Sequence, residues 1–155
     1  MFVKEVMTDS PSTCLATDSA NEAARIMWEC DCGSVPVVDA GGRAVGIVTD
    51  RDICMAAYFR GQPLTQIQLG EIMSKDLCTV SCDSELSDAE RLMQERQIRR
   101  LPVVDNGCLV GIVSLADIAR CASKNGDTRA RPSDGVNREL AQTIERISEP
   151  RLGAH

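Results

Sequence analysis

The sequence predicts an α/β (α+β) fold in which one small unit occurs twice in tandem. Three observations predict it: an internal repeat, an alternation of helical and strand patterns within each copy, and a globular composition. Hydrophobic residues make up 43% of the chain and charged residues 26%, which is typical of a folded protein. Aromatic residues are only 3%, so we expect an aliphatic core. A unit of about 60 residues buries too little surface to be stable alone, so the two copies are expected to pack together.

The repeat appears when the chain is compared with itself. A shift of 66 residues places Thr13 on Thr79 and residues 36–39 on residues 102–105, both with the sequence Pro-Val-Val-Asp. A shift of 65 then places residues 45–48 on residues 110–113, because the first copy has one extra residue in its glycine turn. A gap confined to a turn indicates duplication of one folded unit.

Each copy contains the same predicted elements in the same order. A short starting helix or turn is followed by an extended stretch, an amphipathic helix, two short strands and a second helix. In the first copy the first helix begins near Asp18 with Ser19-x-x-Glu22, the strands are residues 34–39 and 44–49, and the second helix is residues 51–58. In the second copy the first helix begins near Ser84 with Ser87-x-x-Glu90, the strands are residues 101–105 and 109–114, and the second helix is residues 116–122. Both Ser-x-x-Glu patterns predict helix-capping boxes, and Asn106-Gly107 predicts a hairpin turn.

These elements predict four segments. The first domain comprises residues 3–59, and a linker at residues 60–68 begins with the helix-breaking sequence Arg60-Gly61-Gln62-Pro63. The second domain comprises residues 69–123. Residues 124–155 are expected to form a flexible tail with a short amphipathic helix carrying Leu140, Ile144 and Ile147.

Composition and charge exclude several classes of protein. The net charge of −6 disfavours nucleic acid as the primary partner. No apolar run approaches the roughly 20 residues of a membrane span, and the N-terminus lacks a signal peptide, so we expect no membrane partner and a cytoplasmic location. The eight cysteines are then expected to be reduced, and Cys54 and Cys121, within apolar helical runs, to behave as small hydrophobic residues.

Two motifs, each present twice, resemble the signature of cystathionine β-synthase-like (CBS) domains. The first is a strand ending in Pro-Val-Val-Asp, at residues 35–39 and 101–105; the second is Gly-Ile-Val-[Thr/Ser]-x-x-Asp-Ile, at residues 46–53 and 111–118. The resemblance covers residues 3 to about 123. It implies that each copy has a small sheet and two helices, and that the copies pack as a pseudo-two-fold disc, often called a Bateman module. It also implies homodimerisation and regulatory binding of an adenosine-type ligand (AMP, ADP, ATP, NAD or S-adenosylmethionine) in clefts between the repeats.

The motifs also suggest how such a ligand would be held. Thr49 and Ser114 stand where a strand meets a helix N-terminus, whose free N–H groups and partial positive charge favour phosphate. An aspartate one helical turn later can accept hydrogen bonds from ribose hydroxyls. The pairs Val35-Pro36 and Leu101-Pro102 can each form an apolar wall for the base, because proline has no backbone N–H that would compete for hydrogen bonds. The predicted ligand-binding residues are Thr13, Val35, Pro36, Thr49, Arg51, Asp52, Thr79, Arg100, Leu101, Pro102, Ser114 and Asp117. The two sites are not equivalent, because Ser34 stands where the second copy has Arg100.

Alternatives remain at this stage. Thr49-x-x-Asp52 and Ser114-x-x-Asp117 also match the capping-box pattern, and the chain would then be a ligand-free oligomerisation or interaction scaffold. Cys30 and Cys32 allow a thiol-based redox or metal sensor, although the only histidine is His155. No nucleophile motif or phosphate loop is present, so we expect no catalytic residues, no metal, no cofactor and no enzyme activity. A regulatory module of this kind would act on a downstream target protein that the sequence does not identify.

Overall fold

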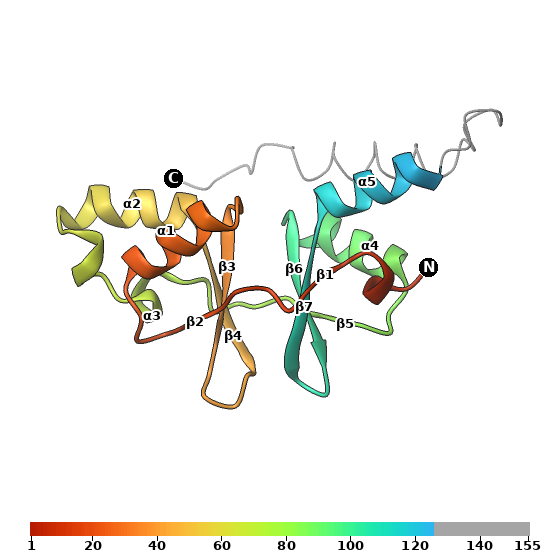
Figure 1. Ribbon diagram of the computed structural model, residues 1–155, viewed down its shortest axis with the longest axis horizontal. Helices are drawn as coiled ribbons and strands as arrows, with labels where there is room; N and C mark the ends of the chain where they lie inside the picture. The colour runs from red at the N-terminus through yellow and green to blue at the C-terminus, as the bar shows by residue number, and fades with distance from the viewer. Residues whose placement is uncertain (126–155) are drawn as a thin grey trace. The chain divides into compact units, whose positions relative to one another are not determined.

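The computed structural model describes residues 1–125, with side chains up to Cys121, and divides into two compact units. The first-repeat unit consists of residues 10–78 and 104–110, and the second-repeat unit consists of residues 1–9, 79–103 and 111–125. Both contain mixed helix and strand (Figure 1). The predicted helix with Leu140, Ile144 and Ile147 lies outside the described residues.

The first-repeat unit is a three-stranded sheet with helices against it. The strand order is β2 (Cys14–Leu15), β3 (Ser34–Val38), β4 (Ala44–Thr49); β2 is parallel to β3, and β3 is antiparallel to β4. Helix α1 (Ala20–Glu29) packs on β3, and α2 (Asp50–Arg60) packs on β4 and on α1. The segment expected to be a linker contains a short 3-10 helix, η2 (Leu64–Gln66), and leads into α3 (Leu69–Ile72). Since Ile67 is fully buried, this linker is part of the core.

The second-repeat unit repeats this arrangement. Its sheet has the order β1 (Thr8–Asp9), β7 (Cys108–Ser114), β6 (Arg100–Asp105), β5 (Val80–Ser81); residues 104–110, at the tip of the β6–β7 hairpin, are counted with the first-repeat unit. The helices are the 3-10 helix η1 (Val3–Glu5), α4 (Leu86–Arg96) and α5 (Leu115–Asn125). The elements of both units match the predicted pattern to within about two residues at each end.

The two copies exchange their starting segments, which the sequence did not predict. In the second-repeat unit, Val3 is buried and its N–H donates to the Ser84 carbonyl at 2.9 Å. The corresponding bond in the first-repeat unit runs from the Leu69 N–H to the Asp18 carbonyl, also at 2.9 Å. Each start therefore packs on the first helix of the other copy, so the packing units differ from the sequence repeats.

The local signals were read correctly at most positions. Asn106 and Gly107 both have positive φ, 49° and 84°, as the predicted hairpin turn requires. Ser19 caps α1 by accepting from the Glu22 N–H, but the Glu22 carboxylate binds Arg25, so only half of the predicted capping box forms. The capping box at Ser87 was wrong: α4 begins at Leu86, so Ser87 lies inside the first turn and its hydroxyl donates to the Glu85 carboxylate.

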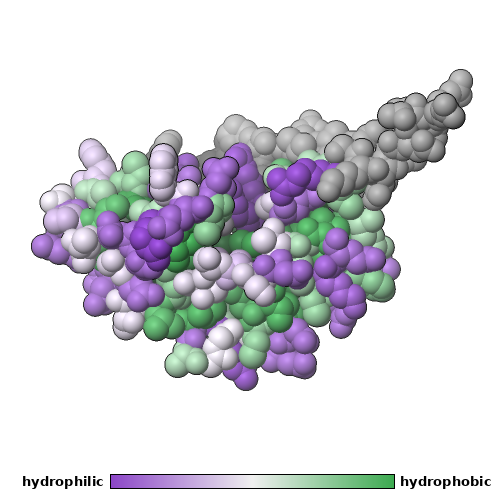
Figure 2. Space-filling model, viewed as in Figure 1, coloured by the Kyte–Doolittle hydropathy of each residue, from purple (hydrophilic) through white to green (hydrophobic). Residues whose placement is uncertain are grey.

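The core is aliphatic, as predicted. The core cluster of the first-repeat unit is built from residues such as Ile26, Val37, Val48 and Leu69. The four aromatic residues are all exposed: Phe2, Trp28, Tyr58 and Phe59. On the face shown in Figure 2, polar and apolar residues are interspersed over both units. Within the described part of the chain, no helix is both long and apolar enough to cross a membrane.

Candidate functional site

In the first-repeat unit, the sheet brings the predicted ligand residues Thr13, Pro36 and Thr49 to one end. The register pairs Ser34 with Thr49 across β3 and β4. Cys14 pairs with Val37 across β2 and β3, which places Thr13 beside Pro36. Thr13 is exposed and Thr49 is half-buried. This end of the sheet leads directly into α2.

The Thr49–Asp52 motif forms a complete capping box at the start of α2. Asp52 Oδ2 accepts from the Thr49 N–H at 2.8 Å and from the Thr49 hydroxyl at 2.8 Å. The Asp52 N–H donates back to the Thr49 hydroxyl oxygen at 3.2 Å. Asp52 Oδ1 accepts no hydrogen bond from any described residue. The cap therefore uses one carboxylate oxygen and leaves the other available.

The Ser114–Asp117 motif forms the same cap, but here the second carboxylate oxygen also has a protein donor. Asp117 Oδ2 accepts from the Ser114 N–H at 2.8 Å and from the Ser114 hydroxyl at 2.6 Å. Asp117 Oδ1 accepts from Nη2 of Arg120, one turn further along α5. The Asp117 side chain is only 9% exposed, so both of its oxygens already have protein donors in a nearly buried position.

The helix N-termini offer fewer free donors than the sequence argument assumed. At α2, the Asp50 N–H donates to the Gly33 carbonyl, and the Arg51 N–H donates to the Asp50 carboxylate. The Asp52 N–H is used by the cap. All three N–H groups are thus engaged, and Asp50 and Asp52 add two negative charges. With these N–H groups engaged, phosphate contact at the start of α2 would depend on the side chain of Arg51.

The predicted cations lie close to the two motifs. Arg51 is exposed and Arg100 is half-buried, and neither side chain pairs with an acid among residues 1–125. Arg100 follows Arg99, whose carbonyl accepts from the Leu115 N–H at 3.0 Å. Arg100 therefore begins its strand beside the start of α5. Thr79, half-buried, directly precedes β5.

The predicted apolar walls lie in the core instead. Val35, Pro36 and Leu101 have less than 2% of their surface exposed, and Pro102 is buried too. The strands that carry them, β3 and β6, lie in the interior of their sheets. In this structure they present no open face to a base.

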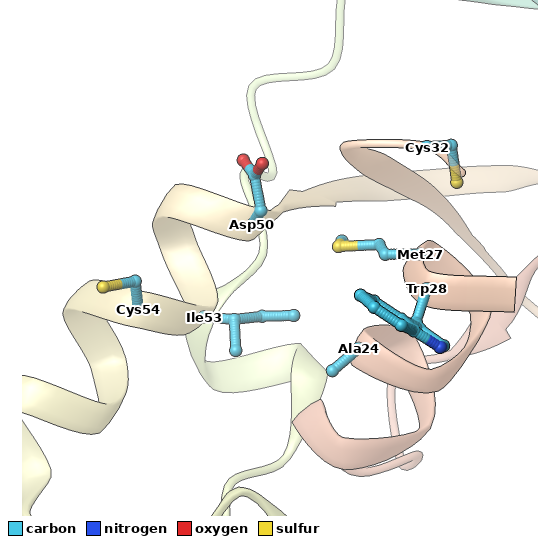
Figure 3. Close-up of a pocket in the computed structure, with 7 residues that line it drawn as sticks. All are labelled: Ala24, Met27, Trp28, Cys32, Asp50, Ile53 and Cys54. Atoms are coloured by element: carbon cyan, nitrogen blue, oxygen red, sulfur yellow. The ribbon is translucent and has the colours of Figure 1, made fainter. Parts of the chain in front are cut away.

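A pocket that the sequence did not predict lies between α1 and α2 (Figure 3). Its volume is about 360 Å³, and Met27, Trp28 and Ile53 face the space between the helices. Ala24, Cys32, Asp50 and Cys54 complete the lining. None of the predicted ligand residues lines it, although Asp50 is the neighbour of Thr49. The exposed Trp28 on the polar side of its helix was the available sequence signal.

The cysteines are all free thiols. Cys14 is 2% exposed, and burial raises the pKa of its thiol to about 11. Cys30, Cys32 and Cys54 are exposed, so the expectation that Cys54 packs as a small hydrophobic residue was wrong. Residues 1–125 contain no group of three or more His, Cys, Asp or Glu side chains placed to hold a metal ion.

Comparison with known proteins gives a family and several structures of the same fold. The profile of the CBS domain matches residues 3–58 and 69–124. Hypoxic response protein 1 of Mycobacterium tuberculosis is 34% identical over 109 residues, which cover 70% of this chain and 76% of that protein. A crystal structure of Hypoxic Response Protein I with two coordinated zinc ions has a TM-score of 0.72 and 30% identity, covering 77% of this chain and 98% of the other.

Two further solved structures contain adenosine compounds. The CBS domain pair of protein MJ0100, in complex with 5′-methylthioadenosine and S-adenosyl-L-methionine, has a TM-score of 0.73 and 30% identity, over 80% of this chain and 97% of the other. The crystal structure of CBSX2 in complex with AMP has a TM-score of 0.69 and 29% identity, and the match covers 79% of this chain and 96% of the other. Adenosine-type ligands therefore occur in structures similar to this one.

Proposed function

Because the chain belongs to the CBS-domain family, we propose that it is a regulatory module that binds an adenosine-type ligand at the Thr49–Asp52 motif. The observation that carries the proposal is the free Oδ1 of a half-buried Asp52, one turn into a helix and next to an unpaired Arg51. The complexes of MJ0100 and CBSX2 support the ligand class. Regulation through ligand binding, rather than catalysis, is the role this assignment implies.

The capping box and the ligand contact are compatible at Asp52. The cap uses Oδ2, and the adjacent hydroxyls of a ribose are donors that Oδ1 can accept. A carboxylate oxygen has more than one lone-pair site, so a ligand need not break the cap. The cap therefore accounts for Oδ2 of Asp52 and leaves Oδ1 available to bind a ligand.

The charges around this motif favour ligands with little negative charge. Asp50 and Asp52 lie in the first turn of α2, and one cation, Arg51, stands between them. Each added phosphate would meet two carboxylates and could pair with only that guanidinium. Among the adenosine compounds considered, we expect AMP or S-adenosylmethionine to bind this site more tightly than ATP.

Titration calorimetry of Asp52→Asn against AMP, ATP and S-adenosylmethionine tests the proposal. A hydrogen bond to a charged group is worth about 1.5–3 kcal/mol, so affinity should fall about tenfold or more. If the carboxylate only complements the helix dipole, stability should fall by about 0.3–1 kcal/mol without a change in affinity. Asp50→Asn is the matched control, because it removes the same charge from the same turn without touching the bonds between Thr49 and Asp52.

Two results would count against this site. Equal losses of affinity for the cationic S-adenosylmethionine in Asp50→Asn and Asp52→Asn would indicate general electrostatics, because the loss of either negative charge should favour AMP and ATP instead. A loss confined to Asp50→Asn and Trp28→Ala would place the ligand in the pocket between α1 and α2 instead. If the parent protein binds no adenosine compound, and mass spectrometry finds none released from it on purification, the proposal fails.

A second candidate function, self-association as a homodimeric scaffold, is favoured by the exposed aromatic residues. Trp28 is 88% exposed on α1, and Tyr58 and Phe59 are 77% and 75% exposed on α2. Aromatic side chains are enriched at protein interfaces. Sedimentation velocity should show a dimer for the parent and a shift toward monomer for Trp28→Glu or Tyr58→Glu; a monomeric parent at micromolar concentration would exclude this candidate.

A further inference from the structure

The two copies treat the same aspartate differently, and one residue causes the difference. Asp52 and Asp117 are equivalent in the repeat and cap their helices in the same way. At Asp117, however, Arg120 donates to Oδ1, the oxygen that remains open at Asp52. The 65-residue shift places Met55 at the position of Arg120, and a thioether cannot donate to a carboxylate.

Helix geometry explains why this position matters. Residues three apart on a helix are neighbours on its surface, so residues 55 and 120 each stand over the motif aspartate. Met55 is 38% exposed and the Arg120 side chain is 66% exposed. Neither side chain belongs to the buried core.

We propose that Arg120 is an internal competitor of the ligand, which makes the second repeat a weaker adenosine site than the first. This inference rests on the proposed function. A ribose that reaches Asp117 must compete with a guanidinium for Oδ1 or share that oxygen with it, whereas a ribose at Asp52 meets no described protein donor on Oδ1. Arg120 is thus a specificity-determining residue that orders the two sites.

The size of the effect follows from the exposure of Arg120. An ion pair with one exposed partner is weak, and the nearly buried carboxylate puts this pair toward the upper end of that range. The expected difference in affinity is therefore about three- to fivefold, which grades the two sites and does not close the second. A graded pair would respond over a wider range of ligand concentration than two equal sites.

Four variants test the proposal as a reciprocal exchange. Asp52→Asn weakens the first site, and adding Arg120→Met should then raise the affinity of the second site for adenosine about three- to fivefold. Asp117→Asn weakens the second site, and adding Met55→Arg should lower the affinity of the first site by a similar factor. Adenosine is the probe because it has no phosphate to which either arginine could turn; thermal melts confirm that each variant is folded.

The possible outcomes separate the inference from the proposed function. If the parent binds adenosine but neither exchange changes the affinity, Arg120 is not a competitor and the inference is overturned while the proposed function stands. If Arg120→Met weakens binding, Arg120 is a ligand contact, which also overturns the inference. If the parent binds neither adenosine nor AMP, the proposed function itself has failed.

Discussion

Replacing Gly46 by alanine tests the close contact between strand β4 and residues 73–74, which end the starting segment of the second copy. Gly46 lies in β4, which faces Met73 and Ser74. A Cβ at this position would lie 2.5 Å from Met73 Sδ and 3.0 Å from the Ser74 carbonyl oxygen. The thioether can move aside, but the carbonyl is held because it accepts from the Ile47 N–H at 3.2 Å. The clash is therefore only partly relieved by side-chain motion.

The magnitude combines two opposing terms. Inserting a methyl group into a packed region costs about 1–3 kcal/mol. Replacing glycine by alanine restricts the unfolded chain and returns about 0.4–1 kcal/mol. We expect Gly46→Ala to lower the free energy of unfolding by about 0.5–2 kcal/mol, measured by urea denaturation. Gly41→Ala is the control, because its Cβ would meet only Asp39 Oδ1, at 3.3 Å.

A double-mutant cycle decides whether the Met73 contact is the cause. Met73→Ala removes the thioether, so Gly46→Ala should cost less in that background than in the parent. Gly111 and Met7 form the equivalent pair in the second-repeat unit. A Cβ at Gly111 would also lie 2.5 Å from the Sδ of Met7, so Gly111→Ala and Met7→Ala should give the same result. An unchanged free energy of unfolding in Gly46→Ala, or an equal loss in both backgrounds, would refute the reasoning.

The local elements of the fold could be predicted because each depends on nearby residues. The Asn106-Gly107 turn and the strands that it joins follow from backbone preferences and alternation. The exchange of starting segments could not be predicted in this way. Because the two copies are similar, residues 3–9 would suit the sheet of either copy, and no local pattern says which one they join.

The part of the candidate site that depends on nearby residues was predicted, and the part that depends on tertiary packing was not. Thr49, Asp52, Ser114 and Asp117 are set by a motif, and the structure forms both caps. Arg120 was missed because the repeat aligns it with Met55, so that it appeared to be one more variable surface residue. The burial of Val35 and Leu101 was missed because an apolar strand residue can face a ligand or the core, and only tertiary packing decides between them.

The remaining predictions concern Cys14, the buried thiol. Because it is 2% exposed, it should react with iodoacetamide far more slowly at pH 8 than the exposed Cys30 and Cys32; equal rates by peptide mass spectrometry would contradict its burial. Stability should also depend on it in alkali. Its pKa is raised from 9.0 to about 11 by burial, so between these values the unfolded chain loses the proton first and unfolding becomes easier as pH rises. One pKa unit corresponds to about 1.4 kcal/mol, so roughly 2 kcal/mol should be lost between pH 9 and 11. Cys14→Ala should remove this part of the loss. Parallel curves for parent and Cys14→Ala would show that the thiol is not the group responsible.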